Sequence, residues 1–286
     1  MLLKKAVLFI SAGIIMSMTG LQANALGGST SSTEIAELRA GSSVETAQGF
    51  CMWSQDGHDC LAAAWIDENH GSYKSYLTVY DLTADKELSS LVNYPMGHAN
   101  DMTRDPMTGH IYVAAGDGSA YDVLEFDEDL DLVGGHDTGT LSGICYDAYS
   151  DTFFLAGGRY IRQVDKDFNE IASFQLEKGG RSGSMVTYQG VVVFKDFLLT
   201  IGVAEQGHWS AQDINVFDKG DGSLIASYDC DVDREVESCA YWNGSLYCTG
   251  NLGSRIRVYQ MDVPGITDGE GAFDEEVLGC KGVETD

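Results

Sequence analysis

The residues best suited to chemistry in this sequence are carboxylates, amides and histidines that stand just before short apolar stretches. Asp101 and Glu237 form the strongest pair, because two carboxylates held across a cleft can hydrolyse a glycosidic bond. Glu235 and Glu237 are two residues apart, so in an extended chain both face one side. Such a cluster also suits Ca²⁺, which takes oxygen ligands. We therefore treat Asp101 and Glu237 as candidate catalytic residues and Ca²⁺ as the one cofactor that the pattern allows, with no metal ligand set assigned.

Further polar and aromatic residues are suited to holding a sugar. Gly97-His98-Ala99-Asn100-Asp101 is the densest polar patch, and Trp and Tyr side chains in long loops can stack on sugar rings. The candidate ligand-binding residues are Gln48, Tyr73, His98, Asn100, Asp101, Arg181, His208, Trp209, Glu235 and Glu237. The alternative is structural, because Asp and Asn side chains often accept hydrogen bonds from nearby backbone amides.

A repeated unit must position these residues. Five times a short polar turn leads into a small or apolar strand that is followed by a second strand. The entrances of the five units are Gln48-Gly49-Phe50-Cys51, Asn100-Asp101-Met102-Thr103, Ser142-Gly143-Ile144-Cys145, Gly183-Ser184-Met185-Val186 and Val236-Glu237-Ser238-Cys239. A period of about 40–50 residues with several strands per unit is typical of a β-propeller. We predict an all-β, five-bladed propeller with four-stranded antiparallel blades.

The ring needs a strand that completes its last blade. Third strands that end in an acidic turn recur at 77–81, 161–165 and 214–218, but the fifth unit lacks an outer strand of its own. Glu34-Ile35-Ala36-Glu37-Leu38 resembles the outer strands of the other units, so we predict that this N-terminal strand closes the ring. Residues 273–278 are the alternative.

The first residues form a leader rather than part of the fold. Lys4 and Lys5 precede an apolar run, and Ala23-Asn24-Ala25 is a small-x-small cleavage site, which together indicate a secretory signal peptide at 1–25. The propeller is then expected at 26–262 and an acidic, Gly-rich tail at 263–286. The expected location is outside the cell, either secreted or at the cell surface.

The charge narrows the range of partners. The chain of 286 residues carries a net charge of −27, and loss of Lys4 and Lys5 with the leader makes it more acidic still. Such a surface repels nucleic acid and anionic lipid. We expect no nucleic-acid partner, no membrane insertion after cleavage of the leader, and a monomer.

The seven cysteines all follow the leader, and the extracellular space permits disulfides. Asn243-Gly244 is a strong hairpin signal, and a two-residue turn there places Cys239 opposite Cys248, which predicts a disulfide between them. Cys51 and Cys60 have the same separation and form a second candidate disulfide, although a turn at Asp56-Gly57 would shift the register and separate them. Cys145, Cys230 and Cys280 stay unassigned.

Three of the units carry a family resemblance. Gln48-Gly49-Phe50, the stretch 97–103 with 105–114, and the stretch 235–238 with 241–247 are similar to blades in secreted and phage-associated propellers of Gram-positive bacteria. These include the propeller of teichoic acid biosynthesis protein C and those of phage receptor-binding proteins; YVTN- and WD40-like repeats are a looser comparison. The resemblance implies a five-bladed propeller that recognises a cell-surface glycopolymer.

Three functions therefore remain open. The first is a secreted binding propeller that recognises an extracellular glycan or wall glycopolymer through the loops at one end of its channel. The second is a hydrolase of a glycosidic or phosphodiester bond that uses Asp101 and Glu237. The third is a protein-interaction scaffold. The sequence contains no Gly-rich nucleotide fingerprint, nucleophile elbow or HExxH motif, so binding is favoured over catalysis.

Overall fold

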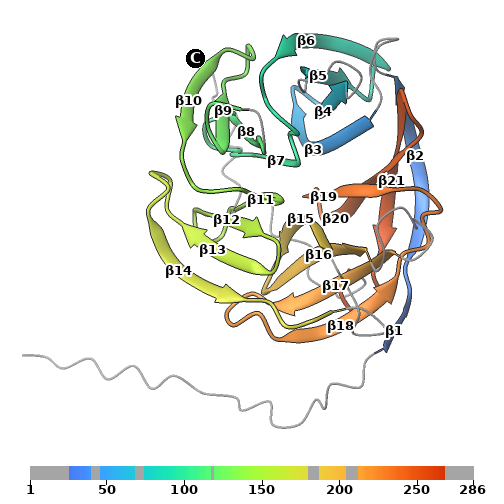
Figure 1. Cartoon of the computed structure of the whole chain (residues 1–286). Coiled ribbons are helices and arrows are strands. Elements are labelled where there is room, and N and C mark those ends of the chain that lie inside the picture. The colour runs from blue at the N-terminus through green and yellow to red at the C-terminus, as the bar shows by residue number, and fades with distance from the viewer. Residues whose placement is uncertain are drawn as a thin grey trace, which may run out of the picture.

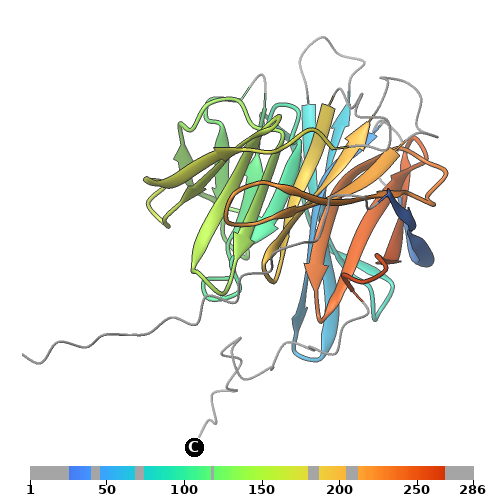
Figure 2. The ribbon, with the colours of Figure 1, turned by 90° about the horizontal axis from the view of Figure 1, so that it is seen from below.

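A computed structural model of the chain shows a five-bladed β-propeller in which antiparallel sheets surround a central axis (Figure 1). It describes residues 26–39, 46–67, 74–116, 119–179, 187–203 and 212–267. Seen edge-on, the strands run between the two faces of the ring (Figure 2). In the described residues no helix could span a membrane. The predicted fold class is confirmed.

The strands of each blade are named here in order from the central axis outwards. Blade 1 comprises β3 (Thr46–Gln55), β4 (His58–Asp67), β5 (Lys74–Asp81) and β6 (Lys86–Tyr94). Blade 2 comprises β7 (Asp101–Arg104), β8 (Ile111–Ala114), β9 (Val123–Phe126) and β10 (Leu132–His136). Blade 3 comprises β11 (Gly143–Asp147), β12 (Thr152–Gly157), β13 (Tyr160–Val164) and β14 (Glu170–Gln175). Blade 4 comprises β15 (Thr187–Phe194), β16 (Phe197–Val203), β17 (Gln212–Asp218) and β18 (Leu224–Asp229).

Blade 5 is built from both ends of the described chain. Its strands are β19 (Val236–Trp242), β20 (Ser245–Asn251), β21 (Arg255–Asp262) and, outermost, β2 (Ser31–Arg39). β2 pairs antiparallel with β21, so the prediction that the N-terminal strand closes the ring is confirmed. The alternative segment 273–278 and the predicted leader 1–25 lie outside the described residues.

The strand before β2 adds a second tie that the sequence did not suggest. β1 (Leu26–Ser29) pairs in parallel with β18, the outer strand of blade 4. Between β1 and β2, the Thr30 hydroxyl donates to Asp231 Oδ1 over 2.8 Å, and Ser32 N and Oγ donate to Asp231 Oδ2. The N-terminal segment therefore holds blades 4 and 5 together.

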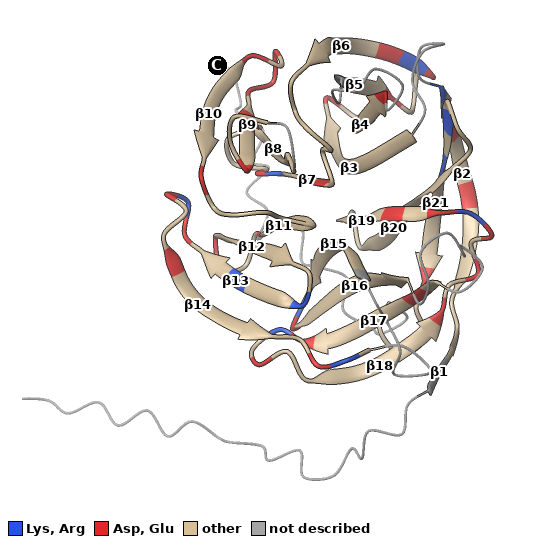
Figure 3. Ribbon diagram, in the orientation of Figure 1, with Lys and Arg blue, Asp and Glu red and all other residues tan. Residues whose placement is uncertain are grey.

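The hydrophobic core lies between neighbouring blades, because alternate residues of each strand face opposite sides of their sheet. Phe50 and Met52 pack towards blade 5, whereas Cys51 and Trp53 pack towards blade 2. The same alternation assigns Cys239 to the core shared with blade 4 and Ala240 to the core shared with blade 1. Acidic residues are spread over the ribbons of all five blades (Figure 3).

This alternation corrects the predicted entrances of two blades. The inner strand of blade 4 is Thr187–Phe194, so its entrance is Gln189-Gly190-Val191-Val192 and not residues 183–186, which lie outside the described residues. In blade 5, Ala240 occupies the place of Cys51, so Glu237 rather than Val236 corresponds to Gln48. Small residues in polar stretches recur by chance, and only packing against neighbouring blades identifies the equivalent ones.

The two cysteine pairs have different outcomes. The Asn243-Gly244 hairpin has the predicted register, with Cys239 opposite Cys248, yet both are free thiols. Burial in the core raises the pKa of both thiols well above the ordinary value of 9.0, which keeps them protonated and unreactive. The predicted disulfide is therefore not formed in this structure.

The second pair fails for a geometric reason. Asp56 and Gly57 form the turn, with φ of 52° and 81°, and this register places Cys60 opposite Trp53 and Cys51 opposite Ala62. The Cys51–Cys60 disulfide is therefore wrong. Cys145 and Cys230 are also free thiols, and Cys280 lies outside the described residues.

Candidate functional site

The five inner strands meet at the axis through one small or acidic residue each. The packing of the inner strands identifies the residues that hold the same position in the five blades. They are Gly49, Asp101, Gly143, Gly190 and Ser238. A Cβ on Gly49 would lie 2.5 Å from the Asp101 carbonyl carbon, and one on Gly143 would lie 2.9 Å from that of Gly190. Such close approach requires glycine. In this ring only Asp101 and Ser238 carry a side chain, and the larger of the two belongs to Asp101.

The Asp101 carboxylate joins three other blades. It is fully buried. Its Oδ2 accepts hydrogen bonds from Ile144 N at 3.0 Å in blade 3 and from Val191 N at 3.1 Å in blade 4. Its Oδ1 accepts from the Ser238 hydroxyl at 2.6 Å in blade 5. Through these hydrogen bonds Asp101 of blade 2 links blades 3, 4 and 5 at the axis.

A local irregularity supplies one of these donors. The pairing of β15 with β16 shifts register between Gln189 and Val192, so the Val191 amide is released from the sheet ladder. β3 and β19 also shift register near the ring, between Ala47 and Phe50 and between Val236 and Cys239, one residue earlier than in β15. Burial raises the pKa of Asp101 to about 7, against the opposing effect of hydrogen bonds from Ser238, Ile144, Val191 and Met102.

The residues that directly precede the ring residues in the chain are all polar, and we call them the polar mouth of the channel. We call the face where the inner strands begin the entrance face. The residues that precede the axial ring there are Gln48, Asn100, Ser142, Gln189 and Glu237. Glu237 Oε2 accepts from Gln189 Nε2 at 2.5 Å, and Asn100 Nδ2 donates to Leu141 O while its Oδ1 lies 2.5 Å from His98 Nδ1. Amides, a hydroxyl and a carboxylate from all five blades therefore converge at one end of the channel.

The entrance of blade 5 contains polar atoms that the described chain leaves unpaired. Among the described residues, Gln189 Oε1, Arg234 Nε and Asn251 Oδ1 are buried and have no hydrogen-bond partner. Each side chain is oriented by its other atoms: Gln189 donates to Glu237, Asn251 Nδ2 donates to Ala47 O at 3.0 Å, and Arg234 Nη1 donates to Asp233 O at 2.9 Å. Asn251 N also bonds Glu235 O. Two acceptor oxygens and one donor nitrogen near residues 234–237 can therefore each form a further hydrogen bond.

The structure places the sequence candidates unevenly. Gln48, Asn100 and Glu237 share the mouth, His98 contacts Asn100, and Glu235 lies in the blade 5 entrance. Tyr73, Arg181, His208 and Trp209 lie outside the described residues. Gln189 is absent from the sequence candidates because the sequence analysis puts the blade 4 entrance at residues 183–186. The pair Gln189-Gly190 repeats Gln48-Gly49, and this repeat could have identified the correct entrance.

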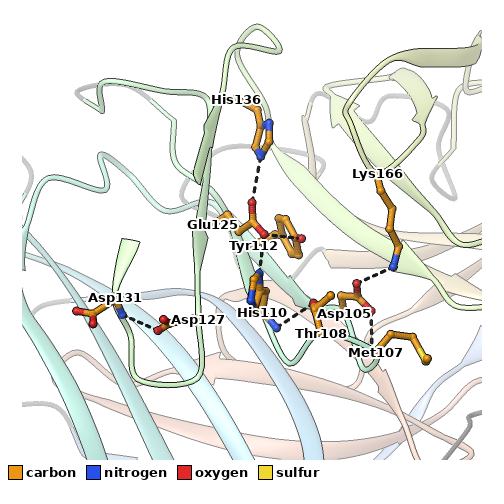
Figure 4. A network of polar contacts seen from close by, with 10 residues as sticks. All are labelled: Asp105, Met107, Thr108, His110, Tyr112, Glu125, Asp127, Asp131, His136 and Lys166. Atoms are coloured by element: carbon orange, nitrogen blue, oxygen red, sulfur yellow. Dashed lines mark hydrogen bonds and ion pairs between the residues drawn. The ribbon is translucent and has the colours of Figure 1, made fainter. Parts of the chain in front are cut away.

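A second polar cluster lies on the flank of blade 2, towards blade 3 (Figure 4). Glu125 Oε1 contacts His110 Nδ1 at 2.6 Å and the Tyr112 hydroxyl at 2.9 Å, while Oε2 lies 3.4 Å from His136 Nε2. The two histidines approach different carboxylate oxygens, so they do not converge on one point. No group of three His, Cys, Asp or Glu among the described residues is arranged to hold a metal ion. We interpret this cluster as part of the fold.

Replacing Glu125 with Gln is expected to lower the free energy of unfolding by about 1 kcal/mol at pH 7, because charge-assisted hydrogen bonds are lost. Burial raises the pKa of Glu125, but hydrogen bonds from His110, Tyr112 and His136 outweigh it and hold the pKa below 4.5. A lowered pKa stabilises the fold above the ordinary pKa, and this stabilisation is lost as the pH falls through the folded value. Urea unfolding should therefore show the difference shrinking below about pH 4; an undiminished difference there would contradict it.

Comparisons with known proteins show no family for this chain. No protein-family model matches this chain, and no curated protein does. The solved structures that resemble it include hydrazine synthase of Kuenenia stuttgartiensis, with 15% identity, a TM-score of 0.46 and coverage of 74% of this chain and 57% of that one. The Pan2 WD40 domain of Neurospora crassa has 10% identity, a TM-score of 0.42 and coverage of 78% and 65%.

A third solved structure is a protein of Parabacteroides distasonis with a provisional assignment as a glycoside hydrolase. It has 12% identity, a TM-score of 0.49 and coverage of 78% of this chain and 88% of that one. This chain spans less than two thirds of the hydrazine synthase and Pan2 chains. At these identities and TM-scores we draw nothing about activity from the likenesses, and the class of protein is a five-bladed β-propeller.

Proposed function

We propose that this protein is a binding propeller that holds an extracellular glycan at the polar mouth of its entrance face, beside the entrance of blade 5. The observation that carries the proposal is the set of unpaired buried atoms there: Gln189 Oε1, Arg234 Nε and Asn251 Oδ1. A buried polar group without a partner is costly, and a bound hydroxyl group would remove that cost.

Sugar hydroxyls match this set chemically. A hydroxyl both donates and accepts, so neighbouring hydroxyls of one sugar could donate to the amide oxygens of Gln189 and Asn251 and accept from Arg234. A 180° flip of either amide group would break an existing hydrogen bond. Gln189 Nε2 donates to Glu237, and Asn251 Nδ2 donates to the Ala47 carbonyl. The acidic surface and Glu237 favour a neutral glycan over a phosphate-rich polymer.

Binding is favoured over hydrolysis by the state of Asp101. A hydrolase that uses Asp101 and Glu237 would need an accessible carboxyl at Asp101, whereas this side chain is fully buried and occupied by the Ile144, Val191 and Ser238 donors. The extracellular setting rests on the leader and the glycan class on the resemblance to secreted and phage-associated propellers. Ca²⁺ stays a candidate ligand, to be tested with the glycan.

The test is a glycan array followed by calorimetry with the best glycan, with and without Ca²⁺. Gln189→Ala and Glu237→Gln are each expected to raise the Kd at least tenfold, because each removes or weakens a polar group at the mouth. Gln260→Ala is the matched control: this amide is exposed on the outer part of blade 5 and bonds Ser245 Oγ, so its Kd should not change. An array without any binding, or a Gln189→Ala variant that binds normally, would contradict the proposal.

A further inference from the structure

The indole of Trp65 carries a buried donor that the fold does not use. Trp65 is fully buried and lies near the end of β4 in blade 1, on the side of the entrance face. In the part of the chain that the structure describes, its Nε1–H has no hydrogen-bond partner. Trp53 of the same blade is satisfied, because its Nε1 donates to Gln55 Oε1 over 3.3 Å. Buried N–H groups are seldom left without an acceptor, so for Trp65 we expect an acceptor from outside the chain.

Trp65 lies next to one of the unpaired acceptors of the entrance face. It belongs to the core cluster between blades 5 and 1, together with Ala47 and Ile256. Ala47 stands directly opposite Trp65 in the β3–β4 ladder, and Ile256 stands opposite Asn251 in the β20–β21 ladder. Asn251 Nδ2 also donates to Ala47 O over 3.0 Å. Trp65 and Asn251 therefore have Ala47 and Ile256 as common neighbours.

The two unpaired atoms have complementary chemistry. Trp65 Nε1–H is a donor only, and Asn251 Oδ1 is an acceptor, yet they do not bond each other. A group that satisfies both must accept from the indole and donate to the amide oxygen. A hydroxyl does this with a single oxygen, whereas a carboxylate has no proton to donate and an ammonium group has no lone pair to accept with. The pair therefore favours a hydroxyl.

This pair lies on the same face as the polar mouth. β3 begins at Thr46 and β20 ends at Asn251, and both of these residues are half-buried. Trp65 is fully buried beside them. A group that arrives from the entrance face therefore meets Asn251 before it meets the indole. The same Asn251 oxygen is already one of the acceptors of the proposed glycan site.

We propose that Trp65 is a further ligand-binding residue: the glycan hydroxyl that donates to Asn251 Oδ1 also accepts a hydrogen bond from Trp65 Nε1. This inference rests on the proposed function and extends its site from the channel towards blade 1. It also makes Trp65 a determinant of specificity. A sugar that lacks this hydroxyl leaves a buried donor unpaired, and a site of this kind discriminates strongly against such a sugar.

Indole ¹H–¹⁵N NMR spectra of the full chain, titrated with the glycan that ranks first on the array, test this proposal. The chain has four tryptophans, and replacing the others one at a time with Phe identifies the Trp65 signal. This signal should move downfield on saturation, because its proton gains an acceptor. The Trp53 signal is the internal control and should stay in place, since its N–H already bonds Gln55. A Trp65 proton that contacts water in the free protein and does not move with the glycan would mean that a water is the partner, which overturns the proposal.

Calorimetry with the same glycan measures the contribution of the indole. Trp65→Phe keeps an aromatic ring and removes the donor, so it should raise the Kd about fivefold, as expected for one hydrogen bond. Asn251→Ala should also raise the Kd. The double variant should lose less than the product of the two effects, because one hydroxyl serves both residues. Trp53→Phe is the matched control and should bind as the wild type does.

The outcomes separate this proposal from the glycan site itself. If Gln189→Ala weakens binding while the Trp65 signal stays in place or Trp65→Phe binds normally, the glycan site stands and the role of Trp65 is overturned. Effects of Trp65→Phe and Asn251→Ala that simply multiply overturn the shared hydroxyl. If no glycan on the array binds, the proposed function fails and this proposal fails with it. Where Trp65→Phe does not fold, the signal of the wild-type chain decides.

Discussion

Replacing Asp101 with alanine is expected to lower the free energy of unfolding by at least about 3 kcal/mol, because buried donors in three blades lose their acceptor. Ile144 N, Val191 N and the Ser238 hydroxyl all point to this one carboxylate. Water that entered the small cavity would satisfy only part of them. Urea unfolding at pH 7, followed by tryptophan fluorescence, measures the loss.

Two further variants separate this role from a general effect of removing an acid. Asp101→Asn keeps the volume and one acceptor oxygen, so it should lose less stability than Asp101→Ala. Asp129→Ala, in an exposed turn, should change stability by no more than about 0.5 kcal/mol. If Asp101→Ala were as stable as Asp129→Ala, the hydrogen bonds would not hold the ring together.

The pH dependence of Asp101 gives an independent check. Its folded pKa of about 7 lies above the ordinary value of 3.8, so the folded protein binds this proton more tightly than the unfolded chain does. The contribution of Asp101 to stability is therefore fully present below about pH 4 and is lost as the pH rises through about 7. The difference in unfolding free energy between wild type and Asp101→Asn should shrink between pH 4 and pH 8. A difference that stays constant or grows with pH would show that Asp101 is ionised throughout.

Replacing Gly49 with alanine is expected to prevent folding or to cost at least about 3 kcal/mol, because the new methyl group has no space. A Cβ there would lie 2.5 Å from the carbonyl carbon of Asp101, 2.7 Å from its Cα and 2.7 Å from Met102 N. All three are backbone atoms, which cannot rotate away as a flexible side chain would. The soluble yield and the urea midpoint of the purified variant measure the effect.

Gly28→Ala is the matched control for this substitution. A Cβ at Gly28 has nothing within 4 Å, so its stability should change by no more than about 0.5 kcal/mol. A Gly49→Ala variant that unfolds at the wild-type midpoint would mean that the inner strands of blades 1 and 2 can separate at low cost, and that the axis is less tightly packed than this structure has it.

Much of the architecture could be predicted because local chemistry repeats along the chain. Turn signals such as Asn243-Gly244 determine hairpin register through backbone conformation alone, and the Cys239–Cys248 alignment follows from it. The outer-strand pattern at 34–38 sufficed to identify the closing strand, because an unfinished last blade leaves only a few segments able to complete it. The Gly183 entrance failed because a single small residue carries no information about its neighbours in space.

The site itself depended on contacts between residues far apart in the sequence. The polar residues at 98–101 were visible as a patch, but a sequence cannot show that Asp101 lies at the axis, because its donors at 144, 191 and 238 come from other blades. The unpaired atoms of Gln189, Arg234 and Asn251 are likewise defined by what surrounds them.

The five-bladed ring and its closure by the N-terminal strand could be predicted from the amino-acid sequence alone, since strand periodicity, turns and repeat length are local properties. Which polar residues serve the fold, and which keep unused hydrogen-bonding capacity, follows only from the tertiary structure. The physical reason is that burial and hydrogen-bond partners are set by residues brought together from different blades.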